Sequence, residues 1–459
     1  MKNLVLFIAV SIFLSSCSEK EIKLSSIELE SLNPFGIPDS SVIKNSYLVF
    51  LNHEKFKPII DEFPSDSSKE NPDIIEKAAL AKINTIVDFG KQYGLDLKAE
   101  QIFVEAASGF IFEDSSETII KKIISEKGQG SINDVQSDFY FYLQNPRARM
   151  QNGGMALPQT VRARMQDHPQ WGYNVEGFTS DAVLYLGGGQ LSDTSNRSDA
   201  KVWIIDSGID IDHQDLKGLV NERLSRSYVD GSPGNDKWGH GTAMAGLIAA
   251  IPENIKFPED PLLIGMTGVS PGAELVSLKV FGEYSEARYS DITRALNHIV
   301  RRQGKSGDII NLSLGNNIRN CHAFGLYSII SRMAKDGYIF SIAAGNAFEG
   351  NSPVNANQYL PACAEGKNIY TIASFKIDYL TGEISFSYFS NFGIPPTDWA
   401  VPGSYIFTTY PEDNKYAVME GTSMSAALFS GLLHLTRGNL NQKTTITDSL
   451  GNIYPVPHK

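Results

Sequence analysis

Hydrophobic positions follow two successive patterns along the chain, and the first occupies residues 41–145. Short apolar runs there alternate with segments in which apolar residues recur at helical spacing. Asn71-Pro72-Asp73 marks the start of the first helix, because proline and an acid suit a helix N-terminus. We predict a small α+β domain in the order β-α-β-α-β. Its expected strands are 47–51, 102–112 and 135–143, and its expected helices are 71–89 and 118–124.

From Lys201 onward, unbroken apolar runs alternate with helical segments. Such runs indicate strands buried on both faces, as in a parallel sheet covered by helices. We therefore predict an α/β domain with a mainly parallel sheet between two helical layers. We expect Ser290-Asp291 to cap one helix and Arg301-Arg302 to end it, in keeping with the helix dipole. The expected strands are 202–205, 275–281, 309–314, 338–344 and 369–374, and the expected helices are the segment after 239, 290–302, 323–335 and 423–436.

Residues 146–170 separate the two patterned regions and show neither period. They contain four arginines, the pair Gly153-Gly154 and Pro158. Exposed segments of this kind are where proteolytic nicking is easiest. We expect a cleavable linker here, between an N-terminal domain of residues 41–145 and a C-terminal domain of residues 171–459.

The first residues form a targeting segment rather than part of the fold. Met1-Lys2 gives a short positive start, Leu4–Leu14 is almost wholly apolar, and Leu-Ser-Ser-Cys ends at Cys17. A run this short suits a secretory leader better than a membrane-spanning helix. Its ending resembles the lipobox of bacterial lipoproteins, which implies a leader of residues 1–17 and lipidation of Cys17. An ordinary leader with a chance cysteine is the alternative. Residues 18–40 are polar and patternless, and we expect them to be a tether.

Composition and charge narrow the range of partners. Of the 459 residues, 42% are hydrophobic and 20% are charged, which is enough for a large core. The net charge of −12 and the lack of any Lys/Arg block argue against a nucleic-acid partner. No later segment is long and apolar enough to span a bilayer, so we expect membrane attachment only through the N-terminal lipid. The expected location is the bacterial cell envelope, after export.

Three short segments carry a carboxylate, an imidazole and a hydroxyl where strands and helices meet. Asp206 ends a buried strand in Ile-Asp-Ser-Gly, His240 enters a helix in Gly-His-Gly-Thr, and Ser423 begins another in Gly-Thr-Ser-Met-Ser. In an open α/β sheet, sites form outside the carboxyl ends of the strands. Each segment alone is more often an ordinary turn or helix cap. Their conjunction on this pattern predicts a nucleophilic triad.

The segments around these three residues resemble the Asp, His and Ser boxes of the subtilisin family, in the chain order known for that family. The resemblance implies a subtilisin-like fold and a serine endopeptidase that needs no cofactor for catalysis. Ser423 would attack the peptide carbonyl, His240 would act as the base, and Asp206 would orient the imidazole. The likeness runs from about residue 171 to 435, and the boxes are 202–216, 239–246 and 421–426.

The same resemblance assigns roles to residues between the boxes. Ala343-Ala344-Gly345-Asn346 is similar to the segment that carries the family's oxyanion asparagine, which implies that Asn346 stabilises the oxyanion. Two further segments are similar to strands that flank the substrate. Side chains bulkier than those of many relatives, on the second of these strands, are expected to narrow the distal subsites. The substrate-binding residues expected on the two strands are Ser313, Leu314, Gly315, Glu286, Ala287 and Arg288.

The N-terminal domain resembles the inhibitory prodomain of subtilisins, although its motifs are less specific than the boxes. An unrelated accessory domain is the alternative. The implied partners are protein or peptide substrates and the chain's own prodomain, with self-cleavage between Leu143 and Gln170. Because Cys17 precedes this cleavage, the mature catalytic domain would be released from the lipid anchor.

Two smaller features concern cysteine and calcium. Cys321 and Cys363 remain after Cys17, and an exported compartment permits a disulfide. Related exported subtilases carry a pair at such positions, which implies a Cys321–Cys363 bond. Asp215 matches a calcium-binding position in some relatives, but residues 251–265 do not match the accompanying loop. A surface aspartate is therefore the plainer interpretation of Asp215, and structural calcium is the alternative.

Two classes of function fit this sequence. The first is an active endopeptidase, and the alternative is a catalytically silent binding or scaffold protein on the same fold. Loss of activity would be expected to alter the triad or Asn346, and all four residues are present. An ester hydrolase is disfavoured because Ser423 lacks the Gly-x-Ser-x-Gly motif.

Overall fold

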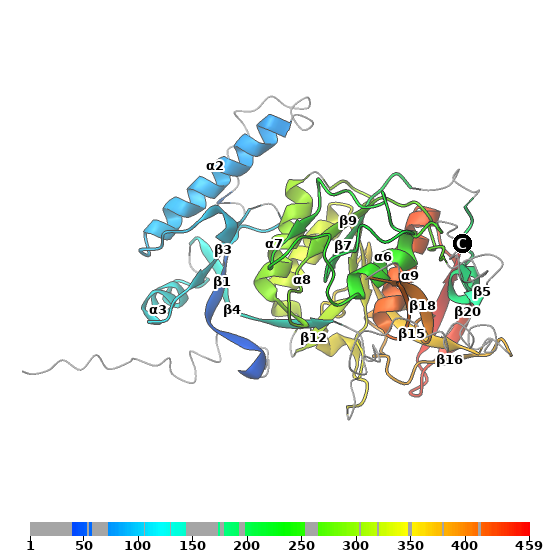
Figure 1. Cartoon of the computed structure of the whole chain (residues 1–459). Coiled ribbons are helices and arrows are strands. Elements are labelled where there is room, and N and C mark those ends of the chain that lie inside the picture. The colour runs from blue at the N-terminus through cyan, green and yellow to red at the C-terminus, as the bar shows by residue number, and fades with distance from the viewer. Residues whose placement is uncertain are drawn as a thin grey trace, which may run out of the picture.

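Two large β-sheets organise the computed structural model, one within the C-terminal domain and one that begins in the N-terminal domain and continues into the C-terminal domain (Figure 1). The expected leader, Cys17, most of the tether and the linker lie outside the residues that the structure describes. We refer to residues 39–143 as the N-terminal domain and to residues 173–459 as the C-terminal domain. The described residues are 39–52, 55–56, 72–104, 106–128, 130–143, 173–174, 179–191, 198–252, 265–302, 304–318, 321–347, 351–378, 381–411 and 415–459.

Eight strands form the sheet of the C-terminal domain. In sheet order they are β16 (Ile384–Phe386), β15 (Ile369–Ile377), β13 (Ile339–Ala343), β11 (Ile309–Leu312), β7 (Val202–Asp206), β9 (Leu275–Lys279) and β8 (Arg226–Ser227), with β17 (Thr397–Pro402) also paired to β15. Neighbouring strands are parallel except β15 and β16. Every residue of β7 is buried, as expected for a strand covered on both faces.

Helices cover both faces of this sheet. They are α6 (His240–Ala249), α7 (Tyr289–Arg301), α8 (Gly325–Lys335) and α9 (Thr422–Thr436). Val202 and Ile204 of β7 share a hydrophobic cluster with α6 and α9. Trp203 and Ile205 of the same strand share another cluster with α7 and α8. Because successive side chains of a strand point to opposite faces, the sheet lies between two helical layers. The predicted three-layer α/β fold is confirmed.

The N-terminal domain has the predicted order of strands and helices. Its elements are η1 (Asp39–Ser41), β1 (Val42–Leu51), α2 (Pro72–Lys91), η3 (Ala99–Gln101), β2 (Ile102–Phe103), β3 (Gly109–Glu113), α3 (Thr118–Ser125) and β4 (Ile132–Leu143). β1 lies between β3 and β4 and is antiparallel to both. Val49, Phe110 and Ile120 belong to a core that the sheet shares with the helices. Figure 1 shows α2 and α3 away from the C-terminal domain.

The opposite face of this sheet packs against the C-terminal domain. Phe139 of β4 lies 5.0 Å from Tyr289 of α7 and 5.3 Å from Phe324, measured between ring centroids. β4 then extends beyond β1 and pairs with two short strands, β10 (Glu286–Arg288) and β12 (Leu314–Asn317). β12 also pairs with β14 (Tyr359–Leu360). The N-terminal sheet is therefore continuous into the C-terminal domain.

The start of α7 differs from the prediction that Ser290-Asp291 caps it. The helix begins at Tyr289, and its N-cap residue, Arg288, makes no side-chain cap bond. The carboxylate of Asp138 in β4 accepts hydrogen bonds from the N–H and the Oγ of Ser290, at 3.0 and 2.7 Å. Asp291 is instead paired with Arg294. A residue of the other domain thus provides the cap.

Small elements complete the C-terminal domain. They are β5 (Tyr173–Asn174), β6 (Thr179–Ser180), α5 (Asp181–Tyr185), η5 (Cys321–Ala323), η6 (Ala356–Gln358), β18 (Ile406–Tyr410), β19 (Lys415–Met419), β20 (Asn441–Thr447) and β21 (Ile453–His458). β18 pairs with β19 and β20 with β21. Cys321 and Cys363 form the disulfide that the resemblance implied. None of the helices in the described part of the chain is long and apolar enough to cross a membrane.

Candidate active site

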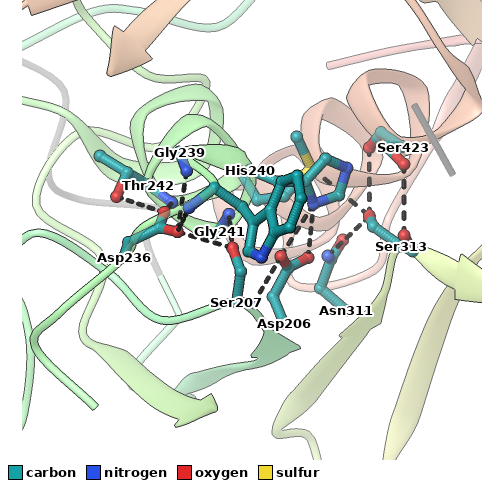
Figure 2. A network of polar contacts seen from close by, with 12 residues as sticks. Asp206, Ser207, Asp236, Gly239, His240, Gly241, Thr242, Asn311, Ser313 and Ser423 are labelled. Atoms are coloured by element: carbon teal, nitrogen blue, oxygen red, sulfur yellow. Dashed lines mark hydrogen bonds and ion pairs between the residues drawn. The ribbon is translucent and has the colours of Figure 1, made fainter. Parts of the chain in front are cut away.

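Asp206 and His240 form a buried pair between the end of β7 and the start of α6. His240 Nδ1 lies 2.8 Å from Oδ1 and 2.9 Å from Oδ2 of Asp206, and Figure 2 shows the ring above this carboxylate. The N–H of Ser207 also donates to Asp206 Oδ1, at 2.7 Å. A carboxylate at Nδ1 favours the tautomer whose proton is on Nδ1, so that Nε2 is the acceptor. Nε2 is buried and has no hydrogen-bond partner among the described residues.

Two glycines allow α6 to begin this close to β7. Gly239 has a φ of 72°, and a Cβ on it would lie 2.2 Å from the ring of Tyr410. A Cβ on Gly241 would lie 2.0 Å from the carbonyl oxygen of Gly208. Neither position has room for a side chain, and the first also requires a left-handed backbone. The Gly-His-Gly sequence is therefore what allows His240 to contact Asp206.

Ser423 is the second residue of α9 and is fully buried. Its Oγ donates to the carbonyl oxygen of Ser313 at 3.3 Å, and the Oγ of Ser313 donates to the carbonyl oxygen of Ser423 at 3.3 Å. The first N–H groups of a helix have no partner within the helix, and the helix dipole makes this end positive. Ser423 therefore combines a hydroxyl with a backbone N–H that suits a negatively charged oxygen.

Asn346 lies just after β13 and contacts the start of α9. Its Oδ1 accepts a hydrogen bond from the N–H of Thr422 at 3.0 Å. The N–H of Gly345 donates to the Oγ1 of Thr422 at 3.1 Å. The residue before Ser423 thus holds the oxygen end of this amide, whose other end is an NH2 donor. Fixed donors near a nucleophile are what acyl transfer needs where charge develops on the carbonyl oxygen.

β4 lies as an extended segment between the two strands that were expected to bind substrate. Tyr142 is opposite Gly315 of β12 on one side and Glu286 of β10 on the other. Leu143 is opposite Leu314. Main-chain pairing of this kind holds a peptide without reference to most of its side chains. β10 and β12 are therefore able to bind an extended chain.

This pairing leads toward Ser423. Leu314, opposite the last residue of β4, directly follows Ser313 in the sequence. The carbonyl oxygen of Ser313 is the acceptor for the hydroxyl of Ser423, at 3.3 Å. A strand bound in the register of β4 therefore points its C-terminal end toward the hydroxyl.

The three residues of β10 alternate between an exposed and a buried face. Glu286 is exposed and Arg288 is partly exposed, with its Nη1 3.9 Å from the Oε1 of Glu113. Ala287, the small residue of the three, is the one that is buried. Because side chains alternate along a strand, the two bulky ones cannot share the buried face with Ala287.

Asp215 is buried and hydrogen-bonded, which differs from the surface aspartate that we expected. Its Oδ2 accepts a hydrogen bond from the hydroxyl of Tyr416 at 2.6 Å and another from the N–H of Met266 at 2.7 Å. The Oδ2 atom of Asp215, which a calcium ion would need as a ligand, is thus already hydrogen-bonded to two donors. Within the described ranges, no group of three or more His, Cys, Asp or Glu residues could hold a metal ion.

Sequence reasoning missed two residues beneath the Asp206–His240 pair. Asp236 accepts hydrogen bonds from the turn that carries His240, and Lys279 is almost fully buried at the end of β9. The signal for Lys279 was a lysine inside a mostly apolar run, Leu275 to Phe281. The signal for Asp236 was weaker, because an aspartate four residues before His240 also fits an ordinary turn.

Comparisons with known proteins agree on one family. A model of the subtilase family matches residues 197–448, more than half of the chain. Thermitase from Thermoactinomyces vulgaris is 28% identical over 263 residues, which are 57% of this chain and 84% of thermitase. The major intracellular serine protease of Bacillus subtilis (strain 168) is 31% identical over 243 residues, which are 52% of this chain and 68% of that protein.

Other relatives are matched over less of their length. Subtilisin J from Geobacillus stearothermophilus is 32% identical over 236 residues, or 51% of this chain. The chain spans about half of that relative, 54%. A crystal structure of a cold-adapted subtilisin-like serine proteinase aligns with a TM-score of 0.44 and 20% sequence identity, covering 59% of this chain and 92% of the other.

Proposed function

Because the chain belongs to the subtilase family of serine endopeptidases, we propose that Asp206, His240 and Ser423 cut peptide bonds and that the N-terminal domain is a self-cleaved, inhibitory prodomain. The observation that carries the proposal is the position of β4. It is an extended segment paired on both sides, and its end points toward the hydroxyl of Ser423. A site that holds a peptide in this way has the geometry for acting on peptides.

The chemistry follows from the groups present. The Oγ of Ser423 attacks the peptide carbonyl carbon while its proton passes to the Nε2 of His240. The imidazolium, stabilised by the carboxylate of Asp206, then donates that proton to the leaving amine. Water repeats both steps on the acyl-enzyme and releases the acid. The N–H of Ser423 and the side-chain amide of Asn346 stabilise the negatively charged oxygen in each tetrahedral intermediate.

Inhibition and self-cleavage use the same strands. β4 is paired with both β10 and β12, so an external substrate can pair with these strands only after it has displaced β4. Leu143 is opposite Leu314, and one more residue in this register would be opposite Ser313, beside Ser423. That residue is Gln144, which lies outside the described part of the chain. We propose that the first bond cut is Gln144–Asn145.

Export and release complete the proposal. The sequence of the leader supports lipidation of Cys17, which precedes the prodomain. Cutting after Gln144 breaks the covalent connection between Cys17 and Ser423. The precursor would then be bound to the membrane, and the catalytic domain would become free once the prodomain has dissociated or been degraded.

A catalytically silent scaffold is the competing function, and an active-site probe distinguishes the two. A fluorophosphonate reacts with a serine only when the serine is activated as a nucleophile. We expect the wild-type protein to be labelled after processing, and Ser423→Ala to remain unlabelled. Ser425→Ala is the matched control, because the Oγ of Ser425 is buried and donates to the carbonyl oxygens of Val401 and Pro402. A folded wild type that is neither processed nor labelled would favour the scaffold.

A further inference from the structure

A buried carboxylate outside the triad connects the two segments that carry Asp206 and His240. Asp236 accepts five hydrogen bonds, and Figure 2 shows it on the far side of Ser207 from Asp206. One donor is the residue after Asp206, and the others surround His240 in the sequence. The donors are Ser207 Oγ at 2.8 Å, Trp238 N at 3.1 Å, Gly239 N at 2.8 Å, Thr242 N at 2.8 Å and Thr242 Oγ1 at 2.7 Å.

Ser207 strengthens this connection. Its Oγ donates to Asp236 and also accepts a hydrogen bond from the N–H of Gly241, at 2.9 Å. The residue after Asp206 and the residue after His240 are therefore held together directly. The distance of 2.8 Å between Asp206 and His240 depends on the relative position of these two segments.

A buried lysine holds the same two segments from the side of the sheet. Lys279 is 2% exposed and lies opposite Asp206 in the pairing of β7 with β9. Its Nζ donates to the carbonyl oxygen of Ser207 and, at 2.8 Å, to that of Asn235. These carbonyls belong to the residue after Asp206 and the residue before Asp236.

The charges of this group depend on one another. Burial raises the pKa of Asp236, and the nearby charge of Asp206 raises it further, although its hydrogen bonds oppose the shift. Burial lowers the pKa of Lys279, while Asp236 and Asp206 oppose that change and Lys237 adds to it. A buried ion is stable only when it is paired or well hydrogen-bonded. Lys279 therefore places a positive charge close enough to two buried carboxylates to interact with both.

We propose that Asp236 and Lys279 are positioning residues of the catalytic site. They hold the Asp206 and His240 segments together, and their charges set the electrostatic environment of the His240 imidazole. The inference rests on the proposed protease function. Neither residue belongs to β10 or β12, so neither is expected to contribute to substrate binding. Their loss should lower kcat and change its pH dependence while leaving KM nearly unchanged.

The direction of the pH effect follows from the charges. Catalysis needs His240 neutral before it accepts the proton of Ser423. Removing the positive charge of Lys279 favours the imidazolium, so the acid limb of kcat/KM should move to higher pH. Removing the negative charge of Asp236 has the opposite effect. We expect each of these charge changes to shift the limb by about one pH unit.

The experiment compares five variants of the processed enzyme, using a chromogenic peptide and fluorophosphonate titration of active sites. The midpoint of the acid limb should lie at higher pH in Lys279→Met and at lower pH in Asp236→Asn. In the double variant it should return toward the wild-type pH. Ser207→Ala removes a connection without removing a charge, so kcat should fall while the limb stays in place. Lys237→Met is the control, because it removes a positive charge beside Asp236 in the sequence that is exposed and screened by solvent, so its profile should shift far less than that of Lys279→Met.

The outcomes separate this inference from the proposed function. A wild type that neither hydrolyses peptide nor reacts with the probe would overturn the proposed function itself. An active wild type with unshifted limbs in Lys279→Met and Asp236→Asn would overturn only the role given to these two residues. If Lys279→Met does not fold, Asp236→Asn still decides, because it removes one buried negative charge and leaves Lys279 opposite Asp206.

Discussion

The two domains bury their sheets in different ways. In the C-terminal domain, the strands have helices of the same domain on both faces. In the N-terminal domain, α2 and α3 cover one face, and the other face is covered by α7 and α8 of the C-terminal domain. The C-terminal domain therefore contains a complete core, whereas the N-terminal domain completes its core only when it is docked. A domain of this kind suits a temporary partner, because its own stability depends on the surface that it covers.

Two phenylalanines of the N-terminal domain allow this difference to be tested, and the effect should be large. Phe139 is on the docking face, and Phe112 is in the domain's own core; both are at most 1% exposed. Replacing a buried phenylalanine with alanine costs about 3–5 kcal/mol. We expect Phe139→Ala to weaken inhibition of the processed enzyme by the N-terminal domain added in trans. Phe112→Ala should mainly lower the free energy of unfolding of that domain.

Urea unfolding of the full chain separates the two effects, with Ser423→Ala as the background to prevent cleavage. In that background, Phe112→Ala should produce an early transition confined to the N-terminal domain. An osmolyte that refolds the domain should restore inhibition by Phe112→Ala but not by Phe139→Ala. If both variants respond alike, the docking face and the core are one cooperative unit, and the contrast between the domains does not hold.

A smaller effect concerns Asp138, which caps α7 across the interface. Burial raises the pKa of this carboxyl above its ordinary value, although hydrogen bonds from Ser290 and Ser46 oppose the shift. The docked form therefore holds the proton more tightly than the released form. Affinity is highest below the ordinary carboxyl pKa near 4 and falls as the pH rises through the raised value. Inhibition constants measured between pH 4 and 8 should show this fall.

Asp138→Asn removes the titrating group and keeps an acceptor for Ser290. Asn is neutral, like the protonated form of Asp138, and is an equally good helix cap, so inhibition at acid pH should stay close to that of the wild type while its pH dependence is reduced. A second carboxyl, Asp291, has a pKa raised by burial to about 6 and lies close enough to contribute to the same fall. If Asp138→Asn retains the full pH dependence, Asp291 or another group is responsible.

Sequence patterns predicted most of the fold because its elements have strong local signals. β7 is a run of five buried apolar and acidic residues, and the Gly-His-Gly turn marks the start of α6. The hairpin of β20 and β21 was not predicted. Of the seven residues in β20 only Ile446 is buried, so the strand has no alternating pattern to detect.

The residues of the candidate site likewise fall into those with a local sequence signal and those without one. Asp206, His240 and Ser423 could be located because each lies in a short motif at the end of an element. The cap of α7 could not, because Asp138 is 152 residues away from Ser290 in the sequence. The roles of Lys279 and Asp236 also depend on contacts between distant segments, and only the folded chain shows those contacts.

If β4 binds as the chain's own first substrate, the mass of the processed protein will show where the chain is cut. Wild-type and Ser423→Ala proteins should be expressed in parallel, and each should be analysed by intact mass and N-terminal sequencing. We predict that the wild type yields a catalytic fragment beginning at Asn145 and that Ser423→Ala retains the N-terminal domain. Equal processing of both proteins, or a first cleavage far from residue 144, would contradict the account.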